Sequence, residues 1–370
     1  MSRNLRLTYL THSLRSDWNN GNAHFLRGLL SSMQQLGHTV EVLEPEHEWS
    51  INNLRDEPEG QRSLDDFRSL YPALPISTYP AGLTDLDHWR SLLHSSEIVI
   101  LHEWNPPALA LLLLDLRDEL GFRLLFHDTH HRASSSPEQI AAFGLPSFDG
   151  VIVFGEVLRS IYRDRFGMDR VWVLHEAADT TIFRPLPTTE KDQDAVWIGN
   201  WGDNERSAEI AEFFLEPAAA LAATQFTIYG VRYPPEGLAA LAATHVRYGG
   251  YLPNLDAPRV YSRSRLTVHI PRQQYSTVMI GIPTIRIFEA LACGIPLLSA
   301  PWQDTESLFR PGDIRFVSNG HAMTDAMTDF LNNPAKAHDY AMQGRDTVLA
   351  RHTCDHRARE LTAICEEHLS

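Results

Sequence analysis

A dense group of polar side chains, HDTHH at residues 127–131, stands in the first half of the chain. It directly follows the mainly apolar segment 122–126, which predicts a strand. Doubly wound sheets present functional side chains at the carboxyl ends of such strands. Two roles stay open: acid–base chemistry, in which His127, Asp128 or His131 takes a proton, or hydrogen bonding at a strand end. We expect no metal here, because no acidic or cysteine partner stands at a characteristic ligand spacing.

A second candidate is Glu289, a carboxylate within the otherwise apolar helical segment 284–293. Such a carboxylate costs free energy unless it has a partner. Either it pairs with Arg286 on the helix surface, or it points into a crevice and accepts hydrogen bonds from vicinal hydroxyls. The first turn of this helix, near Thr284, Ile285 and Arg286, leaves N–H groups free, which suits a phosphate.

A glycine-containing turn, 199–203, follows the predicted strand 195–198 and precedes a predicted helix. Gly199 and Gly202 would let backbone N–H groups approach an anion closely. Arg206 stands just beyond, and its planar fork suits phosphate oxygens. The alternative is an ordinary strand-to-helix turn followed by a surface arginine.

The composition indicates which partners and which cell compartment to expect. The chain has 370 residues and a net charge of −15, and only two of its 32 basic residues are lysines. This balance disfavours a nucleic-acid binder, which usually carries a basic face, and it leaves any anion site to arginines and helix N-termini. The three cysteines form no disulfide or zinc pattern. Because we find no signal peptide and no apolar run of roughly 20 residues, we expect a cytoplasmic protein without a membrane span.

The order of predicted elements gives the fold class. Strands and helices alternate in both halves of the chain, which predicts an α/β protein with two Rossmann-like, doubly wound domains that face a cleft. We expect residues 44–82 to be irregular and one helix to cover about 205–223. The expected domains are a first domain at 1–182, a linker at 183–194, a second domain at 195–350 and a terminal helix at 351–370 that packs back on the first domain.

The segment RIFEALACGIPLL, residues 286–298, resembles the donor-binding signature of GT-B glycosyltransferases. It is more closely similar to the spore-maturation CgeB-like group of that fold. The resemblance covers the C-terminal half well and the N-terminal half loosely. The other stretches that fit this group, in the same order along the chain, are 173–179 with 183–185, 197–206, 269–272 and 351–357.

The resemblance implies a donor site in the C-terminal half. Glu289 would bind the ribose hydroxyls, while Arg206, and less strongly Arg272, would hold the diphosphate. The remaining donor-binding residues would be Gly199, Asn200, Thr284, Ile285 and Arg286. One departure concerns the position eight residues before Glu289, where many retaining GT-B enzymes carry a second glutamate that contacts the donor sugar. Here that position is Gly281.

In the N-terminal half, the resemblance points to the loop 11–24 and to the end of the last strand. Asp17, Asn20 and His24 of the loop would contact the acceptor or donor. His175 and Glu176 would contact the sugar.

Together, these features imply a glycosyltransferase that moves a sugar from a nucleotide-sugar donor, expected to be a UDP-sugar, to an unidentified acceptor. We expect it to act without a metal or another cofactor. Two alternatives stay open: a sugar-nucleotide epimerase or hydrolase of the same fold, or a nucleotide-sugar-binding protein that does not catalyse.

Overall fold

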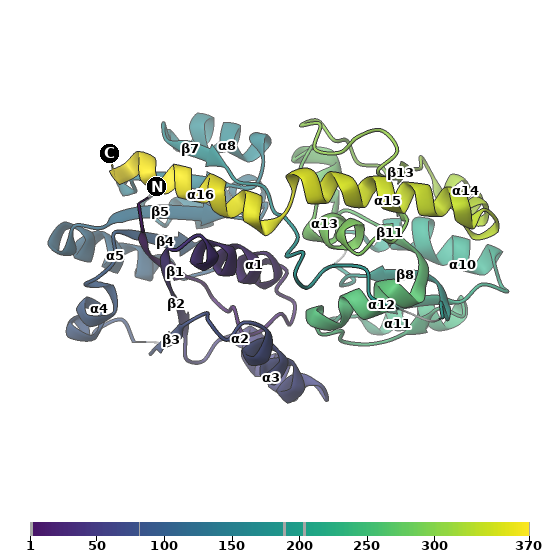
Figure 1. Cartoon of the computed structure of the whole chain (residues 1–370), viewed down its shortest axis with the longest axis horizontal. Coiled ribbons are helices and arrows are strands. Elements are labelled where there is room, and N and C mark those ends of the chain that lie inside the picture. The colour runs from purple at the N-terminus through teal and green to yellow at the C-terminus, as the bar shows by residue number, and fades with distance from the viewer. Residues whose placement is uncertain (1–2, 81, 188–189, 203–204, 370) are drawn as a thin grey trace. The chain divides into compact units, whose positions relative to one another are not determined.

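The chain forms two compact units, residues 1–176 with 354–370 and residues 177–353. The computed structural model describes residues 3–80, 82–187, 190–202 and 205–369. Helix α16 (Cys354–Leu369) packs against α1 (Asn22–Gln35), so the C-terminal helix is part of the first unit (Figure 1). None of the helices within the described residues has the length and apolar character needed to cross a membrane.

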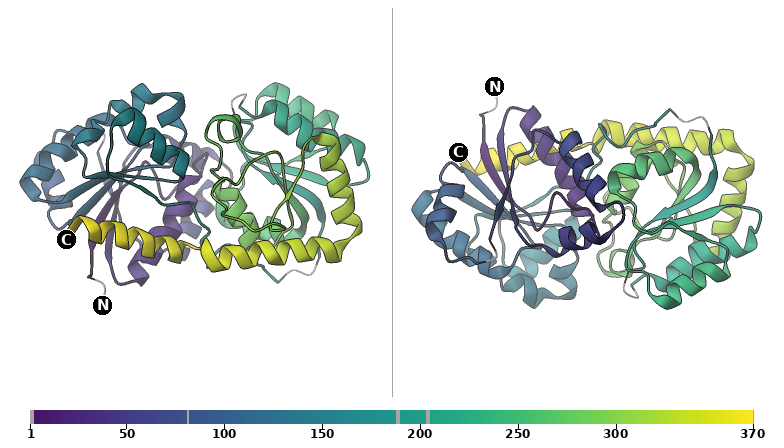
Figure 2. Two further views of the ribbon diagram at one scale, coloured as in Figure 1. Left: turned by 90° about the horizontal axis from the view of Figure 1, so that it is seen from above. Right: turned by 90° about the horizontal axis from the view of Figure 1, so that it is seen from below.

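The first unit contains a seven-stranded, entirely parallel sheet in the order β3-β2-β1-β4-β5-β6-β7. Figure 2 shows helices on both faces of this sheet. Its strands are β1 (Arg6–Leu10), β2 (Thr39–Pro45), β3 (Ile76–Tyr79), β4 (Ile98–His102), β5 (Arg123–Asp128), β6 (Gly150–Val153) and β7 (Val171–Val173). The helices that follow α1 are α2 (Trp49–Asp56), α3 (Gly60–Leu70), α4 (Leu86–Leu93), α5 (Pro107–Leu120), α6 (Arg132–Ser135), α7 (Pro137–Ala141) and α8 (Glu156–Phe166).

The second unit contains a six-stranded parallel sheet in the order β10-β9-β8-β11-β12-β13. The expected α/β class with two doubly wound parallel sheets is therefore confirmed. The strands are β8 (Gln193–Ile198), β9 (Phe226–Tyr229), β10 (Arg247–Tyr248), β11 (Ser264–His269), β12 (Leu297–Ser299) and β13 (Arg315–Phe316). The helices are α9 (Ser207–Ile210), α10 (Glu216–Ala220), α11 (Pro235–Ala243), α12 (Ala257–Arg263), α13 (Ile285–Ala292), α14 (Gly320–Asn332) and α15 (Pro334–Arg351), with short helical turns η2 (Ala211–Leu215), η3 (Asn254–Asp256) and η4 (Gln274–Val278).

Strand β8 explains how the second sheet is covered on both faces. Successive side chains of a strand point to opposite faces. Ala195 and Trp197 join one buried apolar cluster, while Val196 and Ile198 join the other. Because both faces are buried, this strand is a continuous apolar run rather than an alternating one.

Both sheets reverse their strand order beside the first strand of the unit, between β1 and β4 and between β8 and β11. Ligands of open parallel sheets bind beyond the carboxyl ends of the strands at such a point. The carboxyl ends of β4 and β5 carry His102 and the start of the HDTHH segment, and that of β11 carries His269.

Two expectations about individual segments are wrong. Residues 44–82 are not irregular, because they form α2, α3 and β3. The side chain of Glu48 caps α2 by accepting hydrogen bonds from the N–H groups of Ser50 and Ile51 at 2.7 and 3.2 Å. The single helix expected at 205–223 is instead α9, the π-helical turn η2 and α10, which ends at Ala220. Pro217 has no N–H to donate, which fits the altered hydrogen bonding there.

The segment 183–194, expected to be a linker, lies wholly inside the second unit. Phe183 is buried in the core of that unit, and β8 already begins at Gln193. The chain passes between the units at Glu176–Ala177 and again at Thr353–Cys354.

Candidate functional site

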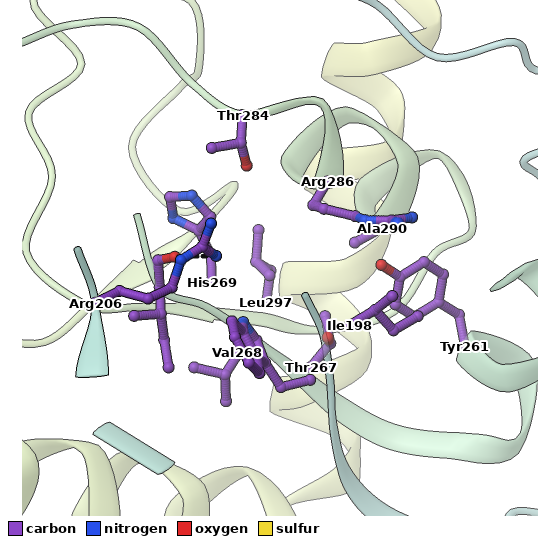
Figure 3. Close-up of a pocket in the computed structure, with 12 residues that line it drawn as sticks. Ile198, Arg206, Tyr261, Thr267, Val268, His269, Thr284, Arg286, Ala290 and Leu297 are labelled. Atoms are coloured by element: carbon purple, nitrogen blue, oxygen red, sulfur yellow. Dashed lines mark hydrogen bonds between the residues drawn. The ribbon is translucent and has the colours of Figure 1, made fainter. Parts of the chain in front are cut away.

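A small pocket lies beyond the carboxyl ends of β8 and β11 in the second unit. Arg206 and His269 lie side by side on one wall, and Arg286 and Tyr261 lie on the opposite one (Figure 3). Thr284, at the start of α13, lines the pocket between these walls. Two arginines, a histidine and a helix N-terminus therefore converge on one small space.

Arg206 is a half-buried cation at this pocket. Its Nη1 donates to the carbonyl oxygen of Ile270 at 3.4 Å, and its guanidinium carbon lies 5.6 Å from the ring centroid of Trp197. No carboxylate among the described residues pairs with it, and its Nε has no hydrogen-bond partner among them. Burial, and then the nearby charge of Arg272, lower the pKa of Arg206 to about 9. The side chain is therefore half-buried rather than freely solvated.

The turn before Arg206 is built around its side chain. Gly202 has a φ of +89°, and a Cβ added there would lie 2.9 Å from Nε of Arg206. Gly199 is required for another reason, because a Cβ there would lie 2.7 Å from the ring of Trp197. The side-chain oxygen of Asn200 accepts a hydrogen bond from the N–H of Val231 at 2.9 Å. Position 203, the end of the expected turn, lies outside the described residues.

Helix α13 carries Ile285, Arg286 and Glu289, and Glu289 is not among the described residues that line the pocket. Thr284 precedes its first turn, and Thr284 and Arg286 line the pocket, whereas Ile285 is buried without lining it. Gly294, with a φ of +67°, follows the helix and ends it.

Glu289 on this helix is only 1% exposed. Its Oε2 accepts a hydrogen bond from Nη1 of Arg286 at 2.7 Å, and its Oε1 accepts one from Nδ2 of Asn254 at 3.1 Å. The Arg286 partner considered from the sequence is therefore present, but the pair is buried at the carboxylate end rather than solvated. The residue that sequence reasoning missed is Asn254, which carries no recognisable motif.

Arg272 and Gly281 stand apart from the pocket lining. Nη1 of Arg272 donates to Oε2 of Glu205 at 2.6 Å, and both side chains are partly exposed. Gly281 has a φ of +108°, and a Cβ there would lie 2.0 Å from Oγ1 of Thr305. The position that holds a glutamate in many retaining GT-B enzymes therefore excludes a side chain in this backbone conformation.

The first unit carries a separate group of buried polar residues beyond β1, β4 and β5. Nδ1 of His127 and the hydroxyl of Tyr9 lie 2.5 Å apart, and the ring centroids of His127 and His102 are 5.7 Å apart. Burial lowers the pKa of His127 to about 3, so this imidazole is neutral at pH 7. Arg132 donates to the carboxylate of Glu103 and stacks on Trp104, with its guanidinium carbon 4.2 Å from the ring centroid.

Asp128 is fully buried, and both of its oxygens accept hydrogen bonds. Oδ1 accepts from the N–H of His130 at 2.9 Å, and Oδ2 accepts from the hydroxyl of Tyr162 at 2.6 Å. Burial raises the pKa of Asp128 to about 6, against the opposing effect of these hydrogen bonds. His131, also expected to be catalytic, shares a hydrogen bond between Nδ1 and Oγ of Ser135 at 2.9 Å. A raised pKa suits a proton acceptor, whereas the occupied oxygens suit a structural role.

The loop residues expected to contact substrate are largely engaged within the first unit. Asp17 forms a buried ion pair with Arg27 at 3.2 Å. The amide of Asn20 donates to the carbonyl oxygens of Ser13 and Ser16 at 2.9 and 3.0 Å. His24 is buried on α1. These contacts fix the shape of the loop.

His175 and Glu176 end the first segment of the first unit. Nδ1 of His175 lies 3.0 Å from the carbonyl oxygen of Phe154, and the carbonyl oxygen of His175 accepts from Arg357 of α16 at 2.8 Å. Glu176 is 6% exposed. Within the described parts of both units, no group of three or more His, Cys, Asp or Glu residues is arranged to hold a metal ion.

Comparison with known proteins found a family that matches part of the second half of the chain. Residues 206–363 match the family described as glycosyl transferase-like. A comparison with curated protein sequences found no significant match.

Three solved structures share the fold over nearly the whole chain. A structure of Anabaena HepE in complex with UDP and glucose is 12% identical, with 97% of this chain and 98% of that chain covered and a TM-score of 0.69. Sucrose-phosphate synthase from Thermosynechococcus elongatus is 14% identical, with 99% of each chain covered and a TM-score of 0.63. The pneumococcal O-GlcNAc transferase GtfA in complex with UDP and GlcNAc is 8% identical, with 99% of each chain covered and a TM-score of 0.66. The glycosyl transferase-like match is therefore confined to residues 206–363, while the whole chain has the GT-B fold of these structures.

Proposed function

We propose that this protein transfers a sugar from a UDP-sugar to an acceptor bound by the first unit. Within its family, we place it in the spore-maturation CgeB-like group, on the motifs in 173–206 and 286–298. The choice of uridine is supported by the structures of HepE and GtfA, which contain UDP.

The observation that carries this proposal is the half-buried guanidinium of Arg206, which pairs with no carboxylate among the described residues. A partly desolvated cation without such a partner gains free energy when an anion binds beside it. The N-terminus of α13 lies at the same pocket, and the N–H groups of a first helical turn favour an anion. A diphosphate between Arg206 and Thr284 would therefore interact with both the guanidinium and the helix N-terminus.

The neighbouring residues suit the rest of a nucleotide sugar. Glu289, held by Arg286 and Asn254, is the carboxylate that we assign to the ribose hydroxyls. During transfer, negative charge builds up on the leaving diphosphate, and Arg206 with the helix N-terminus stabilises it. We therefore expect the reaction to proceed without a divalent cation.

The acceptor side of the reaction belongs to the first unit. If the reaction inverts the anomeric configuration, a base must take the acceptor proton, and we assign this task to Asp128 or a histidine of the same cluster. If it retains the configuration, the leaving phosphate can take that proton. In either case, the loop residues Asp17, Asn20 and His24 would fix the shape of the acceptor site.

Calorimetric titration with UDP, GDP and ADP tests the proposal. The wild type should bind UDP, and Arg206→Met should weaken that binding at least tenfold because a charged hydrogen bond is lost. Arg259→Met is the matched control, since Arg259 is an exposed arginine of α12, and it should leave the affinity unchanged. Turnover of a UDP-sugar should persist in EDTA. Absence of nucleotide binding by the wild type would reject the proposal.

A further inference from the structure

His269 and Ser299 are paired residues of the neighbouring strands β11 and β12. Nδ1 of His269 lies 2.9 Å from Oγ of Ser299. The Ser299 hydroxyl donates its single proton to the carbonyl oxygen of Ala300 at 2.8 Å. Because that proton is already used, Oγ can only accept from His269, so Nδ1 carries a hydrogen.

The other ring nitrogen, Nε2, then carries no hydrogen and presents a lone pair. Burial, and then the charge of Arg206, lower the pKa of His269 to about 3, so the ring is neutral at pH 7. A neutral imidazole with a hydrogen on Nδ1 has none on Nε2. Nε2 is buried and has no hydrogen-bond partner among the described residues, although His269 lines the pocket (Figure 3).

This lone pair restricts what can bind beside it. A buried acceptor without a donor costs free energy, so a bound ligand gains by supplying one. A phosphate oxygen cannot, since an ionised diphosphate carries no hydrogen and would be repelled by the lone pair. The group that meets Nε2 must therefore be an O–H or an N–H.

The neighbours of His269 indicate which part of the donor that is. Arg206, on the same wall, is the residue that we assign to the diphosphate, while Arg286, which positions Glu289, lies on the opposite wall (Figure 3). With the ribose at Glu289, the hydroxyls left for the His269 side are those of the transferred sugar. Gly281, in the loop after β11, has no side chain to offer.

We propose that His269 recognises the transferred sugar, with Nε2 accepting a hydrogen bond from one of its hydroxyls while Ser299 fixes the tautomer. The assignment rests on the proposed function, because it takes the occupant of the pocket to be a nucleotide sugar. It makes His269 a residue that selects the sugar rather than one that binds the nucleotide.

The tautomer can be measured directly. In nitrogen-15 spectra of histidine-labelled protein at pH 7, the His269 signals, identified by their loss in His269→Phe, should show a protonated Nδ1 and an unprotonated Nε2. Addition of the UDP-sugar should move the Nε2 signal, whereas UDP alone should move it much less. A protonated Nε2 in the free protein would overturn the proposal.

Affinity provides the second test. We would compare UDP, UDP-glucose and UDP-glucose analogues in which a single hydroxyl is replaced by fluorine, a group that accepts but does not donate. For the wild type, one analogue should bind about tenfold more weakly than UDP-glucose, the loss expected for one hydrogen bond. His269→Phe should bind UDP-glucose about tenfold more weakly than the wild type does. The variant should bind that analogue as well as it binds UDP-glucose. Its affinity for UDP should equal that of the wild type.

The controls separate this inference from the proposed function. His321→Phe, at an exposed position on α14, should bind every ligand as the wild type does. Ser299→Ala keeps the ring but frees its tautomer, so it should weaken UDP-glucose binding less than His269→Phe does. If His269→Phe weakens the binding of UDP and of UDP-glucose equally, or changes neither affinity, the assignment of His269 to the sugar is wrong. The proposed donor site is not affected by that result. If the wild type binds no nucleotide, both proposals are wrong.

Discussion

Asn254 and Glu289 lie 35 residues apart in the sequence, and the side-chain amide of Asn254 donates to Oε1 of Glu289 at 3.1 Å. Arg286 donates to the other oxygen at 2.7 Å. The carboxylate is thus oriented from two sides before any ligand arrives. Such preorganisation lowers the cost of ordering a binding group.

Replacing Asn254 tests how far this contact stabilises the unit. Asn254→Ala removes one hydrogen bond from a buried carboxylate and should lower the free energy of unfolding by about 1–3 kcal/mol. Urea denaturation measures this, and UDP affinity should fall as well. Asn332→Ala, at an exposed position near the end of α14, is the control. Equal stability of Asn254→Ala and the wild type would show that the contact does not hold Glu289.

The sequence shows why one of these partners was predictable and the other was not. Glu289 stands out because a carboxylate interrupts an apolar helical period, and Arg286 is found at the spacing that brings helix neighbours together. Asn254 lies in the short turn η3, far along the chain, and only the tertiary fold brings it close. The tautomer of His269 was equally out of reach, because it depends on the register of β11 against β12.

Elements of the fold were likewise predictable only where they carry a local signal in the sequence. Buried parallel strands such as β8 are apolar runs that the sequence displays directly. Strand β10 (Arg247–Tyr248) is two residues long and exposed, so it has no apolar signal. Helix α2 was missed because its start depends on a cap by Glu48 within a polar segment.

Arg206 should contribute little to stability while it supports binding. A half-buried guanidinium without a carboxylate partner gains little on folding, so the stability of Arg206→Met should lie within about 1 kcal/mol of the wild type. Saturating UDP should raise the melting temperature of the wild type more than that of the variant. Differential scanning calorimetry with and without UDP measures both effects. A variant that is clearly less stable than the wild type would mean that Arg206 is mainly structural.

A side chain at Gly281 should destabilise the protein. Gly281→Ala places a Cβ at a φ of +108° and 2.0 Å from Oγ1 of Thr305, so we expect a loss of about 1–3 kcal/mol or more. Gly250→Ala is the matched control, since its φ is +69° with open space around the new Cβ, and it should cost only about 1–2 kcal/mol. Adding Thr305→Ala to Gly281→Ala should recover the difference in stability between Gly281→Ala and Gly250→Ala. Equal losses at Gly281 and Gly250 in urea denaturation would show that Thr305 moves aside freely.

The raised pKa of Asp128 predicts that stability depends on pH. Its folded-state pKa of about 6 lies above the usual 3.8, so between these values the native state binds more protons than the unfolded state. Its contribution to stability is therefore full below about pH 4 and is lost as the pH rises through 6.

Asp128→Asn should remove this dependence while keeping the local contacts. The oxygen of the new amide can accept from the N–H of His130, and its nitrogen can donate to the hydroxyl of Tyr162, which rotates to accept. Relative to wild type, the variant should gain stability between pH 5 and pH 8, as measured by urea denaturation at both values. If Asp128 is the base, transfer should also fall by about 10²–10⁴-fold without unfolding. Asp115→Asn, at an exposed position on α5, should change neither property. Full activity in Asp128→Asn would assign Asp128 to structure alone and leave the base to a histidine of the cluster or to the leaving phosphate.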